Sequence, residues 1–219
     1  MTGKQLCITA LLLSFMAGAP SFAEQSEGTF AIGYAKPDGD FGRYAGTALL
    51  LSIRGNAHLT DGSPFTAWLG FQFMQFKNED QGVPYEHAGF HVDATLNTKE
   101  QAYVLMLGGQ FGSGSRKVFF RPRIAGGLGA YLFMADRSLK IRTSSGEDEE
   151  VDSKTDDARI RFGAHTSLGA DFFFTPKWGL GLEIFYDYVW NLRQALGDTN
   201  EKLTVRYGGV ALCVVLPIQ

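Results

Sequence analysis

Hydrophobic and polar positions alternate with a period of two along most of the chain beyond Glu24. Residues 65–77 show the pattern clearly. One face there carries Phe65, Ala67, Leu69, Phe71 and Phe73, and the other carries Thr66, Trp68, Gly70, Gln72 and Met74. Such alternation indicates β-strands with one apolar face and one polar or small face. No helical period of 3.6 residues persists, so the pattern predicts an all-β chain.

The alternating segments are nine in number. They span residues 28–37, 44–56, 65–77, 87–97, 102–111, 118–134, 158–174, 178–190 and 203–217. Short connections at 57–64, 112–117 and 175–177 contrast with long polar ones at 77–86, 135–157 and 191–202. Short turns at one rim and long loops at the other are typical of transmembrane barrels. We therefore predict an antiparallel up-and-down transmembrane β-barrel.

Nine segments do not fit a barrel with both chain ends at one rim, because such a barrel has an even number of strands. Short turns and long loops alternate along the whole chain only when residues 87–97 are part of one long loop, 78–101. The apolar stripe of Phe90, Val92, Ala94 and Leu96 then forms an arm of a hairpin beyond the membrane. This predicts eight strands. Ten strands, with an additional arm drawn from 137–143, are the alternative.

The charged residues indicate which face of the barrel is wet. Six of them share strand faces with glycines: Arg121, Arg123, Arg161, Asp171, Glu183 and Asp187. A water-exposed exterior, as in a secreted lipocalin-like barrel, would carry many Lys and Glu instead. A narrow lumen needs small residues for space, and its charges must pair because burial is costly. We therefore predict that these six residues form a charge network in the lumen. Arg206, which shares the apolar face of its segment, is expected at the rim.

Aromatic residues near the segment ends suggest two interfacial girdles. The candidates are Phe30, Tyr34, Phe65, Phe76, Tyr131, Phe133, Trp178, Tyr188 and Trp190. Composition agrees with a wall assembled from alternate residues, since the 219 residues include 27 Gly and 18 Phe at a mean hydropathy of only −0.06. No apolar run reaches the length of a transmembrane helix, roughly 18 residues. A net charge of −3 gives no indication of nucleic-acid binding.

The first 23 residues have the pattern of a secretory signal peptide. Lys4 precedes an apolar stretch at 8–19, and Ser21-Phe22-Ala23 provides small residues for cleavage before Glu24. The expected domains are therefore the signal peptide, 1–23, and one outer-membrane barrel domain, 24–219. Cys213 is the only cysteine of the mature part, which rules out an internal disulfide there.

Two stretches carry a resemblance to a known family. Residues 162–186, from Phe162 to Tyr186, combine a glycine-containing strand, a Thr-Pro-Lys turn and an aliphatic strand with Glu183. Residues 121–131 form a glycine-rich strand before the long loop 135–157. Both resemble the small outer-membrane β-barrels of Gram-negative bacteria, the opacity-like and OmpA- and OmpX-like porin-fold proteins. The resemblance implies location in the outer membrane. Such barrels usually end in an aromatic residue, whereas this chain ends Leu216-Pro-Ile-Gln219.

One constellation suggests an enzyme. Outer-membrane lipid A deacylases carry a His-x-Ser pair and a Glu, and His165, Ser167 and Glu183 are similar to that set. Alternation directs all three side chains into the lumen, while those enzymes have a membrane-facing site. Glu183, 16 residues past Ser167, is also expected well up the next strand. We therefore expect a polar lumen network and no enzyme.

Possible metal sites are also weak. His87, Glu86, His91 and Asp93 lack tight ligand spacing, and the acidic run 147–150 with Asp152, Asp156 and Asp157 does not follow the EF-hand pattern. The acidic run is expected to be a solvated loop tip, where divalent cations that bridge to lipopolysaccharide could gather. No glycine loop joins a strand to a helix as phosphate binding requires. We expect neither a metal nor a cofactor.

The expected function is structural or surface-interacting. The barrel would hold the loops 78–101 and 135–157 for contact with lipopolysaccharide, a host surface or neighbouring proteins. Outer-membrane lipid and the barrel-assembly machinery are further expected partners. A lipid A hydrolase and a narrow pore are the alternatives.

Overall fold

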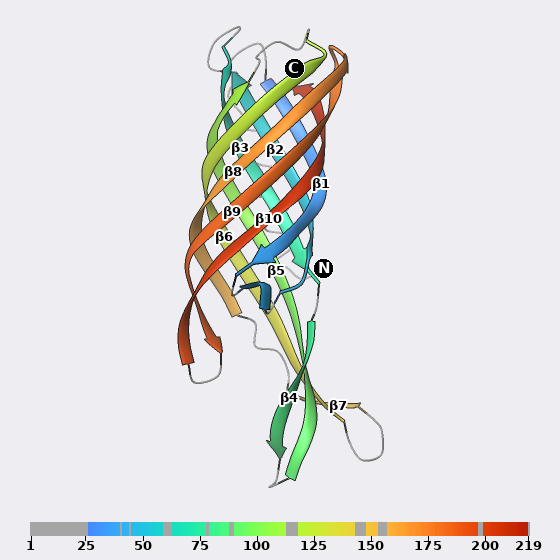
Figure 1. Cartoon of the computed structure of the whole chain (residues 1–219), viewed down its shortest axis with the longest axis vertical. Helices are drawn as coiled ribbons and strands as arrows, with labels where there is room; N and C mark the ends of the chain where they lie inside the picture. The colour runs from blue at the N-terminus through green and yellow to red at the C-terminus, as the bar shows by residue number, and fades with distance from the viewer. Residues whose placement is uncertain are drawn as a thin grey trace.

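The computed structural model describes residues 26–39, 41–43, 45–58, 63–77, 79–87, 90–112, 118–142, 148–152, 157–196 and 199–218. The predicted signal peptide lies outside these residues. The described elements, all strands except one 3-10 turn (Figure 1), are β1 (Ser26–Asp38), η1 (Phe41–Arg43), β2 (Ala48–His58), β3 (Phe65–Phe76), β4 (Glu79–His87), β5 (Phe90–Gly112), β6 (Phe120–Arg142), β7 (Asp148–Asp152), β8 (Asp157–Thr175), β9 (Trp178–Leu196) and β10 (Thr199–Ile218). Among the described residues, no helix is long and apolar enough to cross a membrane.

Eight strands form a closed antiparallel barrel. Their order is β5-β3-β2-β1-β10-β9-β8-β6, and pairing of β5 with β6 closes the ring. The strands β4 and β7 pair with β5 and β6, beyond the wall. The prediction of eight strands is thus confirmed, with the 87–97 segment in a hairpin as expected. The ten-stranded alternative, with an arm from 137–143, is wrong because residues 137–142 lengthen β6 instead of adding a wall strand; residue 143 lies outside the described residues.

The strands are strongly staggered around the barrel. Starting at Asp171, the register passes through Gly181, Cys213, Ala31, Ser52, Gln72, Val104 and Tyr131. It returns to β8 at Arg161, which is 171 − 161 = 10 residues away along the same strand. Such a stagger requires strands that tilt by roughly 35–45° from the barrel axis. Residues far apart in sequence can therefore meet across the lumen.

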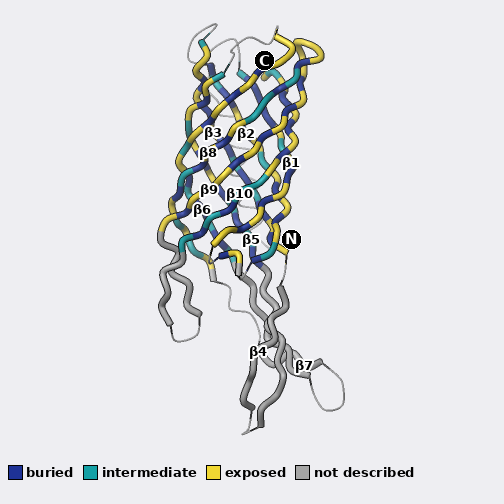
Figure 2. The backbone as a smooth tube through the Cα atoms, viewed as in Figure 1, coloured by how far each residue is buried: buried dark blue, intermediate teal, exposed yellow. Residues whose placement is uncertain are grey.

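The alternation of the sequence becomes the two faces of the wall. Buried and exposed residues alternate along each wall strand (Figure 2). Large apolar side chains such as Ile32, Leu107, Leu128, Phe162 and Leu212 are exposed on the outside. Among the described wall residues, most glycines and most charged residues face inward, whereas Gly55, Gly109 and Gly126 are exposed on the outside. The outer surface is an apolar belt suited to lipid.

Three of the predicted girdle aromatics are placed wrongly by the sequence argument. Phe76, Tyr131 and Phe133 point into the lumen and are 2%, 0% and 8% exposed. Their positions share the parity of inward residues, such as Met74 and Arg123, and parity decides the side of a strand on which a residue lies. The other six predicted aromatics are outward and exposed.

The lumen is filled in two layers. Near the rim of the short turns, which we call the turn rim, it holds charged residues. Near the opposite rim, the loop rim, it holds an apolar cluster that includes Phe41, Met74, Phe76, Val104 and Phe133.

Phe41 enters the apolar layer from η1, a segment that folds back into the barrel mouth. The reversal begins at Gly39, whose φ of +64° is a conformation that glycine adopts without strain. Asp38 accepts a hydrogen bond from the Gly39 amide at 2.7 Å. The Phe41 ring, 1% exposed, lies edge-on to Phe76 and Phe133. The short segment therefore closes the loop-rim end of the lumen.

Candidate functional site

The most highly charged part of the lumen is an alternating chain of three arginines and three carboxylates. Its order is Glu27, Arg121, Asp171, Arg123, Glu183 and Arg54. All six side chains are buried, with relative exposures of 6% or less. Positive and negative charges are equal in number, so the chain is neutral as a unit.

Arg121 lies at the turn-rim end of the charge chain and pairs with two of its carboxylates. Its two terminal nitrogens donate to the two carboxylate oxygens of Glu27 at 2.8 Å, and its Nε and Nη2 donate to Asp171 at 3.2 and 3.0 Å. The guanidinium also lies 4.6 Å from the ring centroid of Phe173. Glu27 is on β1 and Arg121 on β6, and three strands separate these two in either direction round the barrel. The ion pair therefore spans the lumen.

Arg123 and Arg54 continue the chain to its other end. Arg123 donates to Asp171 at 3.1 Å and to Glu183. Arg54 donates to both oxygens of Glu183, at 2.8 and 3.3 Å, and lies 4.8 Å from the Trp68 ring. Planar guanidinium groups suit such bidentate contacts, which are stronger and more directional than those of Lys.

Two residues of the buried charge chain, Glu27 and Arg54, were not predicted from the sequence. Glu27 lies one residue before the predicted segment 28–37, so no strand face was assigned to it. Arg54 lies within the segment 44–56 and shares parity with Ser52 and Asn56, which was a usable signal. The pairing itself depends on the stagger of the strands, which alternation does not reveal.

Arg161, which was predicted to belong to the charge network, lies away from the buried charge chain. It is half-buried near the loop end of β8, where its guanidinium donates to the carbonyl of Ile160 at 2.8 Å. The register places Arg161 opposite Tyr131, far along β8 from Asp171. The inward parity was right, but the ten-residue separation on β8 removes Arg161 from the buried chain. Arg206, expected at the rim, is indeed opposite Asp38 at the loop end of β1.

Asp187 belongs to a second polar cluster, above the charge chain. Its carboxylate accepts a hydrogen bond from the Tyr131 hydroxyl at 2.6 Å and lies 3.2 Å from His165 Nδ1. His165 stacks on Phe185 and meets Trp68 edge-on, with ring centroids 6.2 and 5.8 Å away. Trp68 has space because Gly108 and Gly127 face it, and a Cβ at either would lie 2.7 Å from the indole.

The structure brings His165, Ser167 and Glu183 closer than the sequence argument expected. The tight β8–β9 turn pairs Gly169 with Glu183 and Ser167 with Phe185. Glu183 is therefore one inward position from Ser167, and the expectation that it lies well up the next strand is wrong. The reason is that the turn adds only two residues between the strands.

These three side chains do not make the contacts of a catalytic triad. Glu183 Oε1 is 4.0 Å from His165 Nε2, and the other ring nitrogen faces Asp187. Among the described residues, neither Ser167 Oγ nor His165 Nε2 has a hydrogen-bond partner, so no bond joins the nucleophile to the base. All three residues are buried in the lumen.

The candidate metal residues lie in the hairpin of β4 and β5. The register pairs Glu86 with His91 and Pro84 with Asp93, and His87 ends β4. Their side chains lie outside the described residues, as do those of the acidic run at 147–150. Within the side chains that are described, no group of three or more His, Cys, Asp or Glu residues is arranged to hold a metal ion.

A comparison with protein families identifies this architecture. The description "outer membrane protein beta-barrel domain" is that of the family model matched by residues 7–208. The chain belongs to this family. It is thus an outer-membrane β-barrel protein of a Gram-negative bacterium, as the sequence patterns indicated. No curated protein matches the chain in sequence.

Several solved structures of outer-membrane proteins are similar to this chain over most of its length. Neisserial surface protein A is 15% identical with a TM-score of 0.48, and the match covers 88% of this chain and 97% of that one. Ail, the attachment invasion locus protein of Yersinia pestis, is 16% identical with a TM-score of 0.43, covering 89% and 99%. The outer membrane enzyme PagL is 12% identical with a TM-score of 0.40, covering 88% and 99%.

Proposed function

We propose that this outer-membrane barrel is a non-enzymatic surface-interaction protein that presents a rigid sheet outside the membrane. The observation that carries the proposal is the length of β5 and β6, 23 residues each. A transmembrane β-strand needs only about 9–11 residues. The paired remainder of both strands continues beyond the wall, with Ala94 opposite Ile141 at the far end.

Two further strands widen this extension into a four-stranded sheet. Strand β4 pairs with β5 over residues 79–98, and β7 pairs with β6 over residues 139–152. β4 and β7 are the last strands in the sheet order, so each has one edge without a neighbouring strand in the described part of the chain. Strand edges carry backbone groups that can pair with an added strand. Long loops of such barrels face the cell exterior, so partners there include lipopolysaccharide and extended segments of surface proteins.

The filled lumen supports a closed scaffold in preference to a pore. Three guanidinium–carboxylate pairs cross the turn-rim layer, and Phe41 seals the loop-rim layer. Assembly by the barrel-assembly machinery is a further part of the proposal, since the barrel must be inserted from the periplasm.

The test removes the platform and keeps the barrel. In the full chain, residues 79–98 are replaced by a short Gly-Ser turn, and cells displaying either protein are assayed on surfaces coated with purified lipopolysaccharide or with extracellular-matrix protein. We expect adherence to fall while heat-modifiable gel mobility remains, and the lipid-facing variant Leu128→Ala should adhere like the wild type. Unchanged adherence on both surfaces would contradict the proposal.

The enzyme alternative has its own experiment. Ser167→Ala removes the one hydroxyl of the candidate triad, and lipid A from cells with either protein is compared by mass spectrometry. We expect identical acylation in both strains and in a strain without the protein. A deacylated species that depends on Ser167 would establish the hydrolase.

A further inference from the structure

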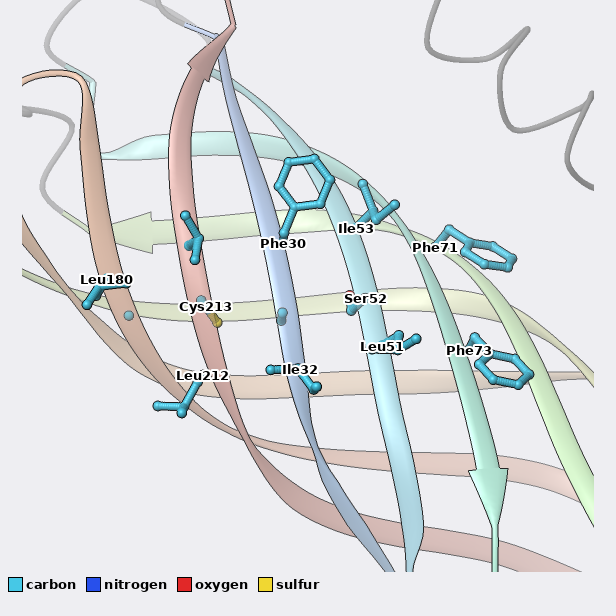
Figure 3. A pocket seen from close by; sticks show the side chains of 13 residues that line it. Phe30, Ile32, Leu51, Ser52, Ile53, Phe71, Phe73, Leu180, Leu212 and Cys213 are labelled. Atoms are coloured by element: carbon cyan, nitrogen blue, oxygen red, sulfur yellow. The ribbon is translucent and has the colours of Figure 1, made fainter.

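A groove crosses the lipid-facing wall between two rows of outward side chains (Figure 3). Register pairs join the residues of the first row, which are Leu180, Val214, Phe30, Ile53 and Phe71. The second row, two residues further along each strand, is Leu212, Ile32, Leu51 and Phe73. Between the rows lie Gly181, Cys213, Ala31 and Ser52, which belong to the inward face, so backbone forms the floor. The groove has a volume of about 730 Å³.

Aromatic rings lie at one end of the groove, and the other end lies near the turn rim. At the β3 end, Tyr103 lies beside Phe73 and Phe71, with ring centroids 5.1 and 6.4 Å apart, and these three rings close the space between the rows. At the other end, Leu180 is two residues from the start of β9 at Trp178, beside the Thr-Pro-Lys turn. Phe71 is six residues from the start of β3 at Phe65. The groove therefore rises from the turn rim toward the middle of the wall.

Its dimensions fit the interior of one leaflet. Five neighbouring strands at about 4.8 Å spacing make it about 19 Å long. With the strands tilted by roughly 35–45°, the rise along the barrel axis is about 12 Å. One leaflet contributes about 15 Å, half of the hydrocarbon thickness of about 30 Å. The rows are about 6.8 Å apart along each strand, which admits a single hydrocarbon chain and excludes the convex wall of a second barrel.

We propose that this groove binds one acyl chain of a phospholipid from the leaflet at the turn rim. The short turns of outer-membrane barrels face the periplasm, so that leaflet lies at the Leu180 end of the groove. Exposed Lys177 and Trp178 lie there, a cation for the phosphate and an interfacial ring beside it. Apolar side chains gain little by leaving lipid, so the selectivity comes from the fit of one chain between Phe30, Ile32 and Leu51. The site is continuous with the lipid-facing belt and is independent of the surface-interaction proposal.

The experiment fills the groove and measures lipid binding by the full-length mature protein. Leu51→Trp places an indole in the centre of the groove. The matched control Leu128→Trp makes the same change on β6, at an outward leucine that is 59% exposed and lines no part of the groove. Both proteins and the wild type are titrated in mild detergent with dipalmitoylphosphatidylethanolamine and, separately, with lipopolysaccharide. Native mass spectrometry counts bound lipids and protein copies.

We expect the wild type and Leu128→Trp to bind one phospholipid with equal affinity, and Leu51→Trp to bind it about tenfold more weakly because several methylene contacts are lost. Equal phospholipid binding by all three proteins would overturn the proposal, as would a groove-dependent preference for lipopolysaccharide. A dimer that Leu51→Trp abolishes would overturn it in favour of a second copy of the chain.

A second variant tests the aromatic end of the groove and does not depend on whether Leu51→Trp folds. Phe73→Ala opens the aromatic closure near Tyr103. We expect the wild type to bind long-chain phosphatidylethanolamines less well than the dipalmitoyl lipid, and Phe73→Ala to lose this discrimination. A chain-length profile that is the same in both proteins would contradict the proposal.

Discussion

The two layers of the lumen reach a closed interior by opposite means. The turn-rim layer is held by charge: Arg121 and Glu27 lie on opposite sides of the barrel and meet at 2.8 Å. The loop-rim layer is held by apolar packing, and its central ring, Phe41, comes from a segment outside the wall. Buried ion pairs are intolerant of losing one partner, whereas apolar clusters tolerate changes that conserve volume. Two layers that are equally buried therefore differ strongly in their sensitivity to substitution.

The largest effect is expected in the charged layer. Arg121→Ala removes the guanidinium that pairs with the buried carboxylates of Glu27 and Asp171, which costs about 3–5 kcal/mol of unfolding free energy. Urea unfolding of the refolded barrel in lipid vesicles measures the loss. The control Lys177→Ala removes an exposed cation and should change stability by less than about 0.5 kcal/mol. Similar values for the two variants would show that the charge chain contributes no more than a surface lysine.

The apolar layer should respond strongly to truncation and weakly to a conservative change. Phe41→Ala leaves a void among Phe76 and Phe133 and should cost about 3 kcal/mol, the low end for a buried Phe. Phe41→Leu keeps most of the volume and should cost less than about 1.5 kcal/mol. The same unfolding measurement decides. Equal losses for both variants would mean that the layer depends on the ring itself.

Conductance measurements show whether each layer alone blocks ion flow through the lumen. Phe41→Ala opens only the loop-rim layer, so planar-bilayer recordings should still show no steady current, because the ion-paired layer remains below it. A steady current through Phe41→Ala would show that Phe41 alone closes the barrel. No current through the wild type is expected, and a wild-type current would support the pore alternative.

Loss of a hydrogen bond at the boundary between the layers should have a smaller effect than loss of Arg121. Tyr131→Phe removes one hydroxyl that donates to Asp187 at 2.6 Å. A hydrogen bond to a charged group contributes about 1.5–3 kcal/mol, and the ring packing is kept. The loss in unfolding free energy should fall below that of Arg121→Ala. A loss as large as that of Arg121→Ala would place Asp187 in the charge chain.

The wall could be predicted from the sequence because alternation reports directly on which side of a strand a residue lies. Arg121, Arg123, Asp171 and Glu183 were correctly placed inside for that reason. Their partners could not be predicted, since Arg54 meets Glu183 only because the stagger brings non-neighbouring strands into contact. Phe76 was wrongly assigned to the outer girdle because it lies near a strand end. Its parity along the strand is that of the inward residues. The groove on the outer wall was not predicted, because it depends on register across five strands.

The pair of Glu27 and Arg121 has a consequence for how the barrel is assembled. The two residues are 94 positions apart in the chain. Contacts of such long separation form late, after the strands between them have taken their places. We expect barrel intermediates to lack this ion pair until then, and its formation to favour completion of the ring over a partly inserted form. The ion pair between Glu27 and Arg121 is therefore expected to form late in assembly, and in the complete barrel it fills part of the lumen.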